Sequence, residues 1–501
     1  MRVCTIFVYL FGVVQAFNIL FIPEKYSASH IWSMMPLAIK LRDRKHHVTF
    51  LDFNDKSDPT VEFPEGISNI HINYTEVSSH SDFLERKWKE RWRGSGIWRA
   101  YLEVENYFEE SYFSRKEQYQ HVLNKKWDLV LVDIMDNNHG FAIGQLLYNS
   151  GVPYALVHTS VLFHSFSAAM SLGNNPISRM SMFASLPQYR YKPYNPKSFY
   201  ERFDQFYDTT METINLLYRL PPHLRMHKTI TQETFSFEKI YSNAAYSITD
   251  NMDELGFPSP TSTSLLSAGS HCLERDKSGL TSELSSFVSE KSAGIIYVAF
   301  GSVVDWATAP QAKKKVFFNA LNELEEFRII FIYSGNDYKF KRHIKTVKWV
   351  NQAAVLKHPN TKVFLSHGGL KSFRESLCAL VPMVILPIFA EQAYNCRLAV
   401  ERGFALALNK NEMTVEQIKS SIKQVAHNAT FHKYIKHNYE IYSDQPMEEL
   451  DKVAFSLERS IRLTSRRRPQ FEIKGVYNTW LAHFYLDCFL IFIFSLFISY
   501  M

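Results

Sequence analysis

One segment of the chain, Phe364 to Gln392, combines residue types that suit phosphate binding. It reads FLSHGGLKSFRESLCALVPMVILPIFAEQ, in which an apolar run ends in His367, Gly368 and Gly369 and the following residues have helical spacing. Glycine lets the main chain approach a ligand closely, and a helix N-terminus offers unpaired amides and a partial positive charge. A strand, a Gly-Gly turn and a helix also occur in α/β units that bind nothing, so alone this segment is a weak indication of a phosphate site.

Two series of alternating strand and helix patterns surround this segment. In the first half, NILFIP, HVTFLDF, WDLVLVD and VPYALVHTS have the composition of strands, and stretches such as 31–44 between them have helical spacing. A Ser- and Thr-rich stretch at 259–292 precedes a second series, from GIIYVAFGS through KVFLSHGG and VPMVILP to FALALN. Such alternation predicts parallel sheets that bind ligands beyond the carboxyl ends of their strands. The aromatic-rich stretch 180–241 lacks a period and is either a substrate-facing insertion or a helical cover.

Size, charge and cysteine content narrow the class of protein. A chain of 501 residues suits about two domains, and its net charge of +6 comes from Lys and Arg that alternate with Asp and Glu, which argues against nucleic-acid binding. Cys4 and Cys488 lie in apolar terminal segments. The remaining thiols, Cys272, Cys378 and Cys396, lack CxxC spacing, so we expect neither a disulfide framework nor a zinc site.

Both ends of the chain predict entry into the secretory pathway. Residues 1–16 have a short charged start, an apolar core and a small final residue, as in a signal peptide; a first buried strand is the alternative. Residues 480–501 are almost entirely apolar and just long enough for a transmembrane helix, with a peripheral or buried helix as the alternative. The cluster Arg466–Arg468 would then lie in the lumen, against the positive-inside tendency. Sequons at Asn73 and Asn428 are compatible with N-glycosylation there.

The segment at 364–392 resembles the signature of the UDP-glycosyltransferases. Similar stretches upstream are GIIYVAFGS and KWVNQAAVLKHP, those downstream are YSDQPMEELDKVAFSLE and HFYLDCF, and the first half is similar in layout from ILFIPEKYSASH onward. The resemblance implies an α/β fold of GT-B type, in which two Rossmann-like doubly wound domains face a cleft, plus a C-terminal transmembrane helix. The signature positions are FLSHGG, Ser372, Glu375, Pro382, Pro387, Glu391 and Gln392.

The resemblance also implies a division into domains. We expect a signal peptide at 1–16, an N-terminal acceptor-binding domain at 17–270, a linker at 271–290, a C-terminal UDP-sugar-binding domain at 291–445, a returning helix and juxtamembrane segment at 446–479, and a transmembrane helix at 480–501.

In the second domain the resemblance implies a UDP-sugar site. Trp349 is expected to stack on uracil, because an indole offers a flat apolar face, and Glu375 to accept hydrogen bonds from the ribose hydroxyls. The residues expected at the diphosphate are Ser302, His367, Gly368, Gly369 and Lys371. Gln352 is expected near Trp349 and uracil, Glu391 and Gln392 at the sugar hydroxyls, and Ser372 elsewhere along the UDP-sugar.

The catalytic pair implied by the resemblance comes from the first domain. His30 occupies the position of a base that takes the proton of the acceptor hydroxyl, and Asp133 that of its acidic partner, with Asp136 as the alternative partner. The diphosphate would leave in a single inverting displacement. The resemblance implies no cofactor besides the UDP-sugar co-substrate. It also implies no metal ion, because backbone amides, His367 and Lys371 are expected to compensate the charge of the diphosphate.

Three positions depart from the family pattern. Asn351 stands where the family usually has Pro, and Lys371 replaces an Asn that commonly follows HGG. Ser259 stands where many relatives have Arg, and loss of that cation favours UDP-glucose over UDP-glucuronate as the donor.

These features predict a UDP-glycosyltransferase, a hexosyltransferase anchored in the endoplasmic reticulum or another secretory-pathway membrane as a single-pass type I protein with lumenal catalytic domains. The expected partners are the UDP-sugar donor, a small lipophilic acceptor and the membrane; a homo-oligomer is also allowed for, and nucleic acid is not expected. The alternative is a catalytically silent relative that binds UDP-sugar or a lipophile and acts as a carrier or partner subunit.

Overall fold

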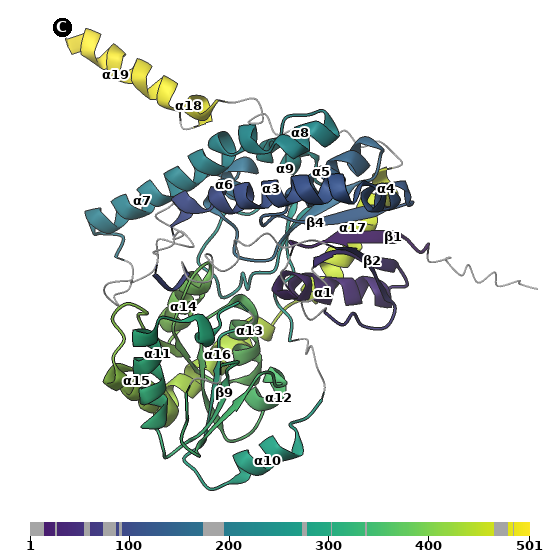
Figure 1. The fold of residues 1–501 in the computed structure, drawn as a ribbon. Coiled ribbons are helices and arrows are strands. Elements are labelled where there is room, and N and C mark those ends of the chain that lie inside the picture. Colours follow the sequence, from purple (N-terminus) through teal and green to yellow (C-terminus); the bar gives the residue numbers. More distant parts are fainter. Residues whose placement is uncertain are drawn as a thin grey trace, which may run out of the picture.

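The computed structural model of the chain describes residues 15–25, 28–54, 61–73, 87–89, 93–173, 195–272, 278–301, 303–335, 338–464, 479–483 and 485–500. Two parallel sheets, each covered by helices, form two domains that follow one another along the chain (Figure 1). The prediction of two doubly wound α/β domains is therefore confirmed. Residues 1–14 of the expected signal peptide at 1–16, and the basic cluster Arg466–Arg468, lie outside the described residues.

The first sheet has the strand order β3-β2-β1-β4-β5-β6-β7, and every pair is parallel. The order reverses between β1 and β4, and ligands of such sheets bind at this switch point. Strands β1, β4 and β5 are almost wholly buried, since helices cover both faces. The strands are β1 (Asn18–Ile22), β2 (His47–Asn54), β3 (Ile67–Asn73), β4 (Leu129–Asp133), β5 (Tyr154–His158), β6 (Ser247–Thr249) and β7 (Leu265–Ser267).

The helices of the first domain connect these strands (Figure 1). They are α1 (Ala28–Asp43), η1 (Gly94–Gly96), α3 (Trp98–Ser114), α4 (Lys116–Asn124), α5 (Asn138–Asn149), α6 (His164–Ala169), α7 (Phe199–Ile214), η2 (Asn215–Arg219), η3 (Pro221–His223), α8 (Arg225–Thr231) and α9 (Phe237–Asn243).

Helix α7 lies in the aromatic-rich stretch for which the sequence left two interpretations open. Its buried face is polar: Glu212 accepts hydrogen bonds from the amide and hydroxyl of Ser165, both at 2.9 Å, and Asp208 accepts one from the amide of Gly94. Its outer face is aromatic and exposed. The described part of the stretch is thus a helical cover whose buried face is polar and whose exposed face is aromatic. The exposed aromatic side chains are Phe199, Tyr200, Phe203, Phe206 and Tyr207.

The second sheet has the order β10-β9-β8-β11-β12-β13, again parallel, with its switch point between β8 and β11. Its strands are β8 (Ile295–Ala299), β9 (Arg328–Ile332), β10 (Ile344–Val347), β11 (Thr361–Ser366), β12 (Met383–Ile385) and β13 (Ala405–Ala407). Its helices are α10 (Ser282–Ser289), η4 (Trp306–Thr308), α11 (Gln311–Asn322), α12 (Gln352–Leu356), α13 (Leu370–Ala379), α14 (Gln392–Glu401), α15 (Val415–His427) and α16 (Ala429–Ser443).

Helix α17 (Glu449–Thr464) returns from the second domain to pack on α1 of the first. Leu450, Val453 and Leu457 of α17 enter the apolar cluster that α1 and the first sheet share. Glu458 accepts hydrogen bonds from Arg44 at 2.6 and 2.9 Å. This part of the chain thus packs against the first domain, and α17 lies within the segment 446–479 for which the sequence predicts a returning helix.

The last described helices are α18 (Trp480–His483) and α19 (Leu486–Tyr500), which lie beyond the first domain on the side away from the second (Figure 1). Most side chains of α19 are large, apolar and exposed, among them Phe489, Leu490 and Phe492. Within the described residues, no helix combines the length and apolarity needed to cross a membrane.

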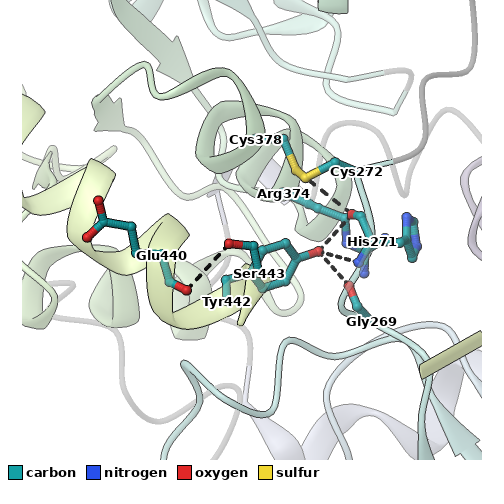
Figure 2. The surroundings of a disulfide bond; sticks show 8 residues. All are labelled: Gly269, His271, Cys272, Arg374, Cys378, Glu440, Tyr442 and Ser443. Carbon is teal, nitrogen blue, oxygen red and sulfur yellow. Dashed lines mark hydrogen bonds between the residues drawn. A yellow bond between two sulfur atoms is a disulfide. The ribbon is translucent and has the colours of Figure 1, made fainter. Parts of the chain in front are cut away.

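A disulfide joins Cys272 to Cys378, so two of the three body cysteines, for which we expected no disulfide framework, are paired. The two residues are 106 positions apart, and the fold brings the segment after β7 against the end of α13. Figure 2 shows Tyr442 beside this bond; its hydroxyl accepts from the amide of His271 at 2.7 Å and lies 2.7 Å from the main-chain oxygen of Gly269. The disulfide therefore fastens the interdomain connection to the helix that follows the HGG turn.

Candidate active site

The side chains of His30 and Asp133 meet at the switch point of the first sheet. His30 lies in the first turn of α1, directly after β1, and Asp133 is the last residue of β4. Nδ1 of His30 is 2.6 Å from Oδ2 of Asp133. When Nδ1–H donates to this carboxylate, Nε2 carries the lone pair that can accept a proton. The geometry thus suits a general base held by an acid.

Asp133 is itself held by several donors. Its side chain is fully buried, and it accepts hydrogen bonds from the amides of Glu24 and Met135, at 3.4 and 3.1 Å. The hydroxyl of Thr159 also donates to it, at 3.1 Å to Oδ1, and Thr159 Oγ1 lies 2.8 Å from Nδ1 of His30. Thr159 follows β5 and is a site residue that the sequence did not suggest.

The environment of His30 changes its affinity for protons. Burial lowers the pKa of His30, but the charge and hydrogen bond of Asp133, together with the charge of Glu24, outweigh burial, so the pKa lies above its ordinary value. Lys371 opposes this rise. The nearest groups thus stabilise the imidazolium that proton abstraction would create.

Lys371 brings the second domain to this pair. It lies in the first turn of α13, and its ammonium donates to the main-chain oxygen of Thr159 at 3.3 Å. A second contact between the domains is the buried ion pair between Arg374 of α13 and Asp250 after β6, at 2.6 Å. The N-terminal turn of α13 therefore faces the His30 site.

The HGG turn between β11 and α13 has a backbone that requires glycine. Gly368 has φ +84°, and a Cβ there would lie 2.6 Å from Cγ2 of Ile385. The ring of His367 lies so close to Gly369 and Gly301 that a Cβ on either would come within 2.6 or 2.9 Å of it. Close packing of backbone and imidazole leaves the first amides of α13 next to the ring, as a phosphate site needs.

His367 is neutral at physiological pH. Burial, with the charge of Lys87, lowers the pKa of His367 to about 3. A neutral imidazole keeps one N–H donor, which suits a hydrogen bond to a phosphate oxygen. Ser302, predicted at the same diphosphate, lies outside the described residues.

Gln352, Ser372 and Glu375 form one connected group on α12 and α13. The amide nitrogen of Gln352 donates to Glu375 and lies 3.4 Å from the hydroxyl of Ser372. The oxygen of Gln352 accepts from the hydroxyl of Tyr297 at 3.1 Å. Gln352 therefore orients the carboxylate that the sequence predicts at the ribose.

Trp349 lies between β10 and α12 with 70 % of its surface exposed, which rules out a role in the core. Asn351, where the family usually has Pro, caps α12 by accepting from the amide of Ala354 at 3.1 Å. The substitution therefore keeps the start of α12 well defined next to the exposed indole.

Glu391 and Gln392 occupy different environments at the start of α14. Oε1 of Glu391 accepts from the amide of Leu370 at 3.4 Å, so it lies beside the HGG turn. Gln392 is buried, and its oxygen accepts from the amides of Ile388 and Phe389 at 2.8 and 3.1 Å. Gln392 thus shapes the loop before α14, and its amide nitrogen is the part suited to a sugar hydroxyl.

The first domain also contributes to the second near His367. Trp88 packs against Trp306 in the apolar core of the second domain, with ring centroids 4.9 Å apart. Its neighbour Lys87 donates to the main-chain oxygen of Val303. The sequence suggested neither contact.

The remaining predicted positions lie on the surface or at strand ends. Ser259 is exposed between β6 and β7. Asn428 is exposed and caps α16 through the amide of Thr430, while Asn73 ends β3 in a sequon whose threonine lies outside the described residues.

Two Rossmann-like domains, with a His–Asp pair in one and an HGG turn in the other, define the class of GT-B glycosyltransferases. Among solved structures, the chain is similar to glycosyltransferase VinC in complex with dTDP, at TM-score 0.58 and 15 % identity, over 89 % of this chain and 99 % of that chain.

Sequence comparison gives the family. The profile described as UDP-glucoronosyl and UDP-glucosyl transferase matches residues 18–498, so the chain belongs to this family of UDP-glycosyltransferases. UDP-glycosyltransferase UGT5 of Dactylopius coccus is 24 % identical over 501 residues, which cover 96 % of this chain and 90 % of the relative. UDP-glucuronosyltransferase 1A7 of Mus musculus is 22 % identical over 497 residues, covering 95 % of this chain and 88 % of the relative.

Proposed function

We propose that the chain transfers a hexose from UDP-sugar to the hydroxyl of a small lipophilic acceptor. His30 takes the proton of the acceptor hydroxyl on Nε2, the acceptor oxygen bonds to the anomeric carbon, and the bond from that carbon to the UDP oxygen breaks with inversion. Asp133 fixes the tautomer of His30 and stabilises the imidazolium. UDP is the leaving group.

One observation carries this proposal. Nδ1 of His30 lies 2.6 Å from Oδ2 of Asp133, and Lys371 of α13 in the second domain contacts Thr159 of the same site. The proposed base and the helix N-terminus suited to a diphosphate thus lie close together, as transfer between two bound substrates requires.

UDP-glucose is the proposed donor, and UDP-glucuronate is the other candidate. Ser259 stands where many relatives have Arg, and because a donor carboxylate favours an Arg partner, the loss of this cation favours UDP-glucose. The printed names of the relatives include both UDP-glycosyltransferase and UDP-glucuronosyltransferase, so similarity alone does not choose between the sugars.

The proposal is tested by incubating the membrane-bound protein with UDP-glucose or UDP-glucuronate and a panel of phenols, sterols and alcohols. Release of UDP and a β-glycoside product from the α-configured donor are expected, with UDP-glucose the better donor. UDP binding without transfer to any acceptor would favour the alternative, a silent carrier or partner subunit. Preference for UDP-glucuronate would overturn the assignment of the donor.

We also propose a lumenal location, attached to the membrane of the endoplasmic reticulum or another secretory compartment, with N-glycans at Asn73 and Asn428. The disulfide between Cys272 and Cys378 supports an oxidising compartment, and the exposed apolar side chains of α19 support membrane contact. Protease protection in sealed microsomes and a mobility shift on deglycosylation test this location. A second copy of the chain is a further candidate partner, tested by sedimentation in detergent.

A further inference from the structure

Arg374 of α13 joins the second domain to the first through a buried ion pair. Its Nη2 donates to Oδ1 and to the main-chain oxygen of Asp250, both at 2.6 Å, and the two side chains are only 6 % and 3 % exposed. Nε2 of His271, in the connection between the domains, accepts from Nη1 at 3.0 Å, because a guanidinium can only donate (Figure 2). Arg374 therefore fixes α13 to two segments that precede the second domain.

The ion pair lies next to the N-terminal turn of α13 at the proposed active site. Lys371 and Arg374 are three positions apart, so they lie on the same face of the helix. Lys371 contacts the main-chain oxygen of Thr159 after β5, and Arg374 contacts Asp250 after β6. Strands β5 and β6 are parallel neighbours, so both contacts lie at the carboxyl edge of the first sheet, where the His–Asp pair also lies.

Stability alone does not account for this ion pair. Nε of Arg374 and Oδ2 of Asp250 are buried and make no hydrogen bond to any residue that the structure describes. Removing two charges from water is costly, and apolar side chains of similar volume often stabilise a fold equally well or better. Directed, charge-assisted hydrogen bonds do fix one geometry between the groups they join. The contacts thus favour a role in the placement of α13.

We propose that Arg374 and Asp250 are positioning residues, which hold the N-terminus of α13, and with it the donor diphosphate, at the distance from His30 that transfer requires. This inference rests on the proposed function, because it concerns where the donor of that reaction lies relative to the base. Neither residue is proposed to touch a substrate. Both act through Lys371, whose contact with Thr159 depends on the placement of α13.

The pKa of His30 reports on this placement. The charged groups that act on His30 include Asp133, Glu24 and Asp136 of the first domain and Lys371 of the second. Lys371 alone among these four lies on α13, and its charge lowers the pKa of His30. If α13 moves away, this effect is lost and the pKa of His30 rises, so the acid limb of kcat/KM moves to higher pH.

The ion pair itself stays charged over the pH range of such an assay. Burial raises the pKa of Asp250, but the charges of Arg374 and Lys371 help to outweigh burial, so the pKa lies below its ordinary value. Burial lowers the pKa of Arg374, but the charge of Asp250 raises it above its ordinary value. A shift of the acid limb therefore does not come from titration of the pair.

The experiment removes the pair as a whole. The double variant Arg374→Met, Asp250→Leu leaves neither charge of the pair buried without the other, so it should fold and bind UDP with the affinity of the wild type. With the full-length protein, UDP-glucose and 4-propylphenol, kcat should fall about 10- to 100-fold, the effect of a displacement of the reacting groups by about 1 Å. The acid limb of kcat/KM should move to higher pH.

Two comparisons separate positioning from a general loss of structure. Adding Lys371→Met to the double variant should move the acid limb no further, because Arg374 and Asp250 act on His30 through Lys371. Cys378→Ser removes the disulfide at the other end of α13. This variant should lower the thermal stability and leave the acid limb where it is in the wild type.

The outcomes distinguish this inference from the proposed function. A double variant with the kcat and acid limb of the wild type overturns the positioning role and leaves the proposed function intact. An equal shift in Cys378→Ser, or a further shift on adding Lys371→Met, also overturns the positioning role. No transfer by the wild type to 4-propylphenol or to any other acceptor overturns the proposed function and the inference with it.

A second variant carries the test if the double variant does not fold. Arg374→Lys keeps the buried positive charge but loses the forked geometry of the guanidinium, so its ammonium cannot reproduce the contacts with both Asp250 and His271. Its acid limb should shift in the same direction as in the double variant, and its kcat should fall. Unchanged kcat and an unchanged acid limb in Arg374→Lys would overturn the positioning role.

Discussion

The ammonium of Lys371 donates to the main-chain oxygen of Thr159 at 3.3 Å and thereby joins the second domain to the first. The hydroxyl of Thr159 lies 2.8 Å from Nδ1 of His30, so one residue connects the proposed donor site to the proposed base. Burial lowers the pKa of His30, but the charges of Asp133 and Glu24 raise it above its ordinary value. The charge of Lys371 opposes that rise. The charge of Lys371 thus acts on both halves of the proposed reaction.

Lys371→Met should move the acid limb of the pH profile of kcat/KM to higher pH. Without the opposing cation the pKa of His30 rises further, so the base stays protonated, and inactive, up to a higher pH. The KM for UDP-glucose should also rise, because a charge-assisted contact to the diphosphate is lost. Lys436→Met on the exposed face of α16 is the control. An acid limb at the same pH in Lys371→Met would contradict this account.

Much of the second domain could be predicted because its predicted site residues follow one another along a short segment. The strand, the HGG turn and the helix are local features, and the positions of His367, Glu375 and Glu391 follow from that local structure. Gln392 shows the limit: its residue type suits a sugar hydroxyl, but its oxygen binds backbone amides of the preceding loop. A local sequence pattern predicts where a side chain lies, but it does not predict which group each of its polar atoms binds.

The remaining contacts join residues far apart in sequence. Thr159 meets His30 across 129 positions, and Cys272 meets Cys378 across 106. No spacing rule links such pairs, because strand order and helix packing bring them together. Trp88, an aromatic residue of the first domain, likewise packs in the core of the second.

Trp349→Ala should weaken UDP binding by about 1 to 3 kcal/mol, the free energy of a lost base-stacking contact. Because the indole is exposed, its removal should leave the thermal stability nearly unchanged. Isothermal titration with UDP measures the effect, and Phe113→Ala on α3, another exposed aromatic residue, is the matched control. Unchanged UDP affinity in Trp349→Ala would place uracil elsewhere.

Cys378→Ser should destabilise the protein because the disulfide closes a loop of about 100 residues. Loss of such a bond typically lowers the free energy of unfolding by about 2 to 5 kcal/mol. We expect a lower urea midpoint for Cys378→Ser, and reductant should lower the wild type to the same value. Cys488→Ser, which removes an exposed free thiol, should unfold as the wild type does. A midpoint insensitive to both Cys378→Ser and reductant would mean that the bond adds no stability.

His30→Ala should separate binding from chemistry. If the second domain binds the donor and His30 supplies the base, UDP affinity should stay the same while transfer to a hydroxyl acceptor slows by about 10² to 10⁴. Asp133→Asn should cause a smaller or comparable loss, because the base remains but loses the carboxylate at 2.6 Å that orients it and supports its charge.

The acceptor series gives the sharper test of His30. A nitrophenol ionises without help, so its transfer should suffer less from His30→Ala than transfer to an aliphatic alcohol, whose proton must be removed as the new bond forms. Single-turnover rates with UDP-glucose, measured for both acceptors in the wild type and in His30→Ala, give the two ratios. Equal losses for both acceptors, or full activity in His30→Ala, would assign the base to another group and leave the hydrogen bond to Asp133 as a structural contact.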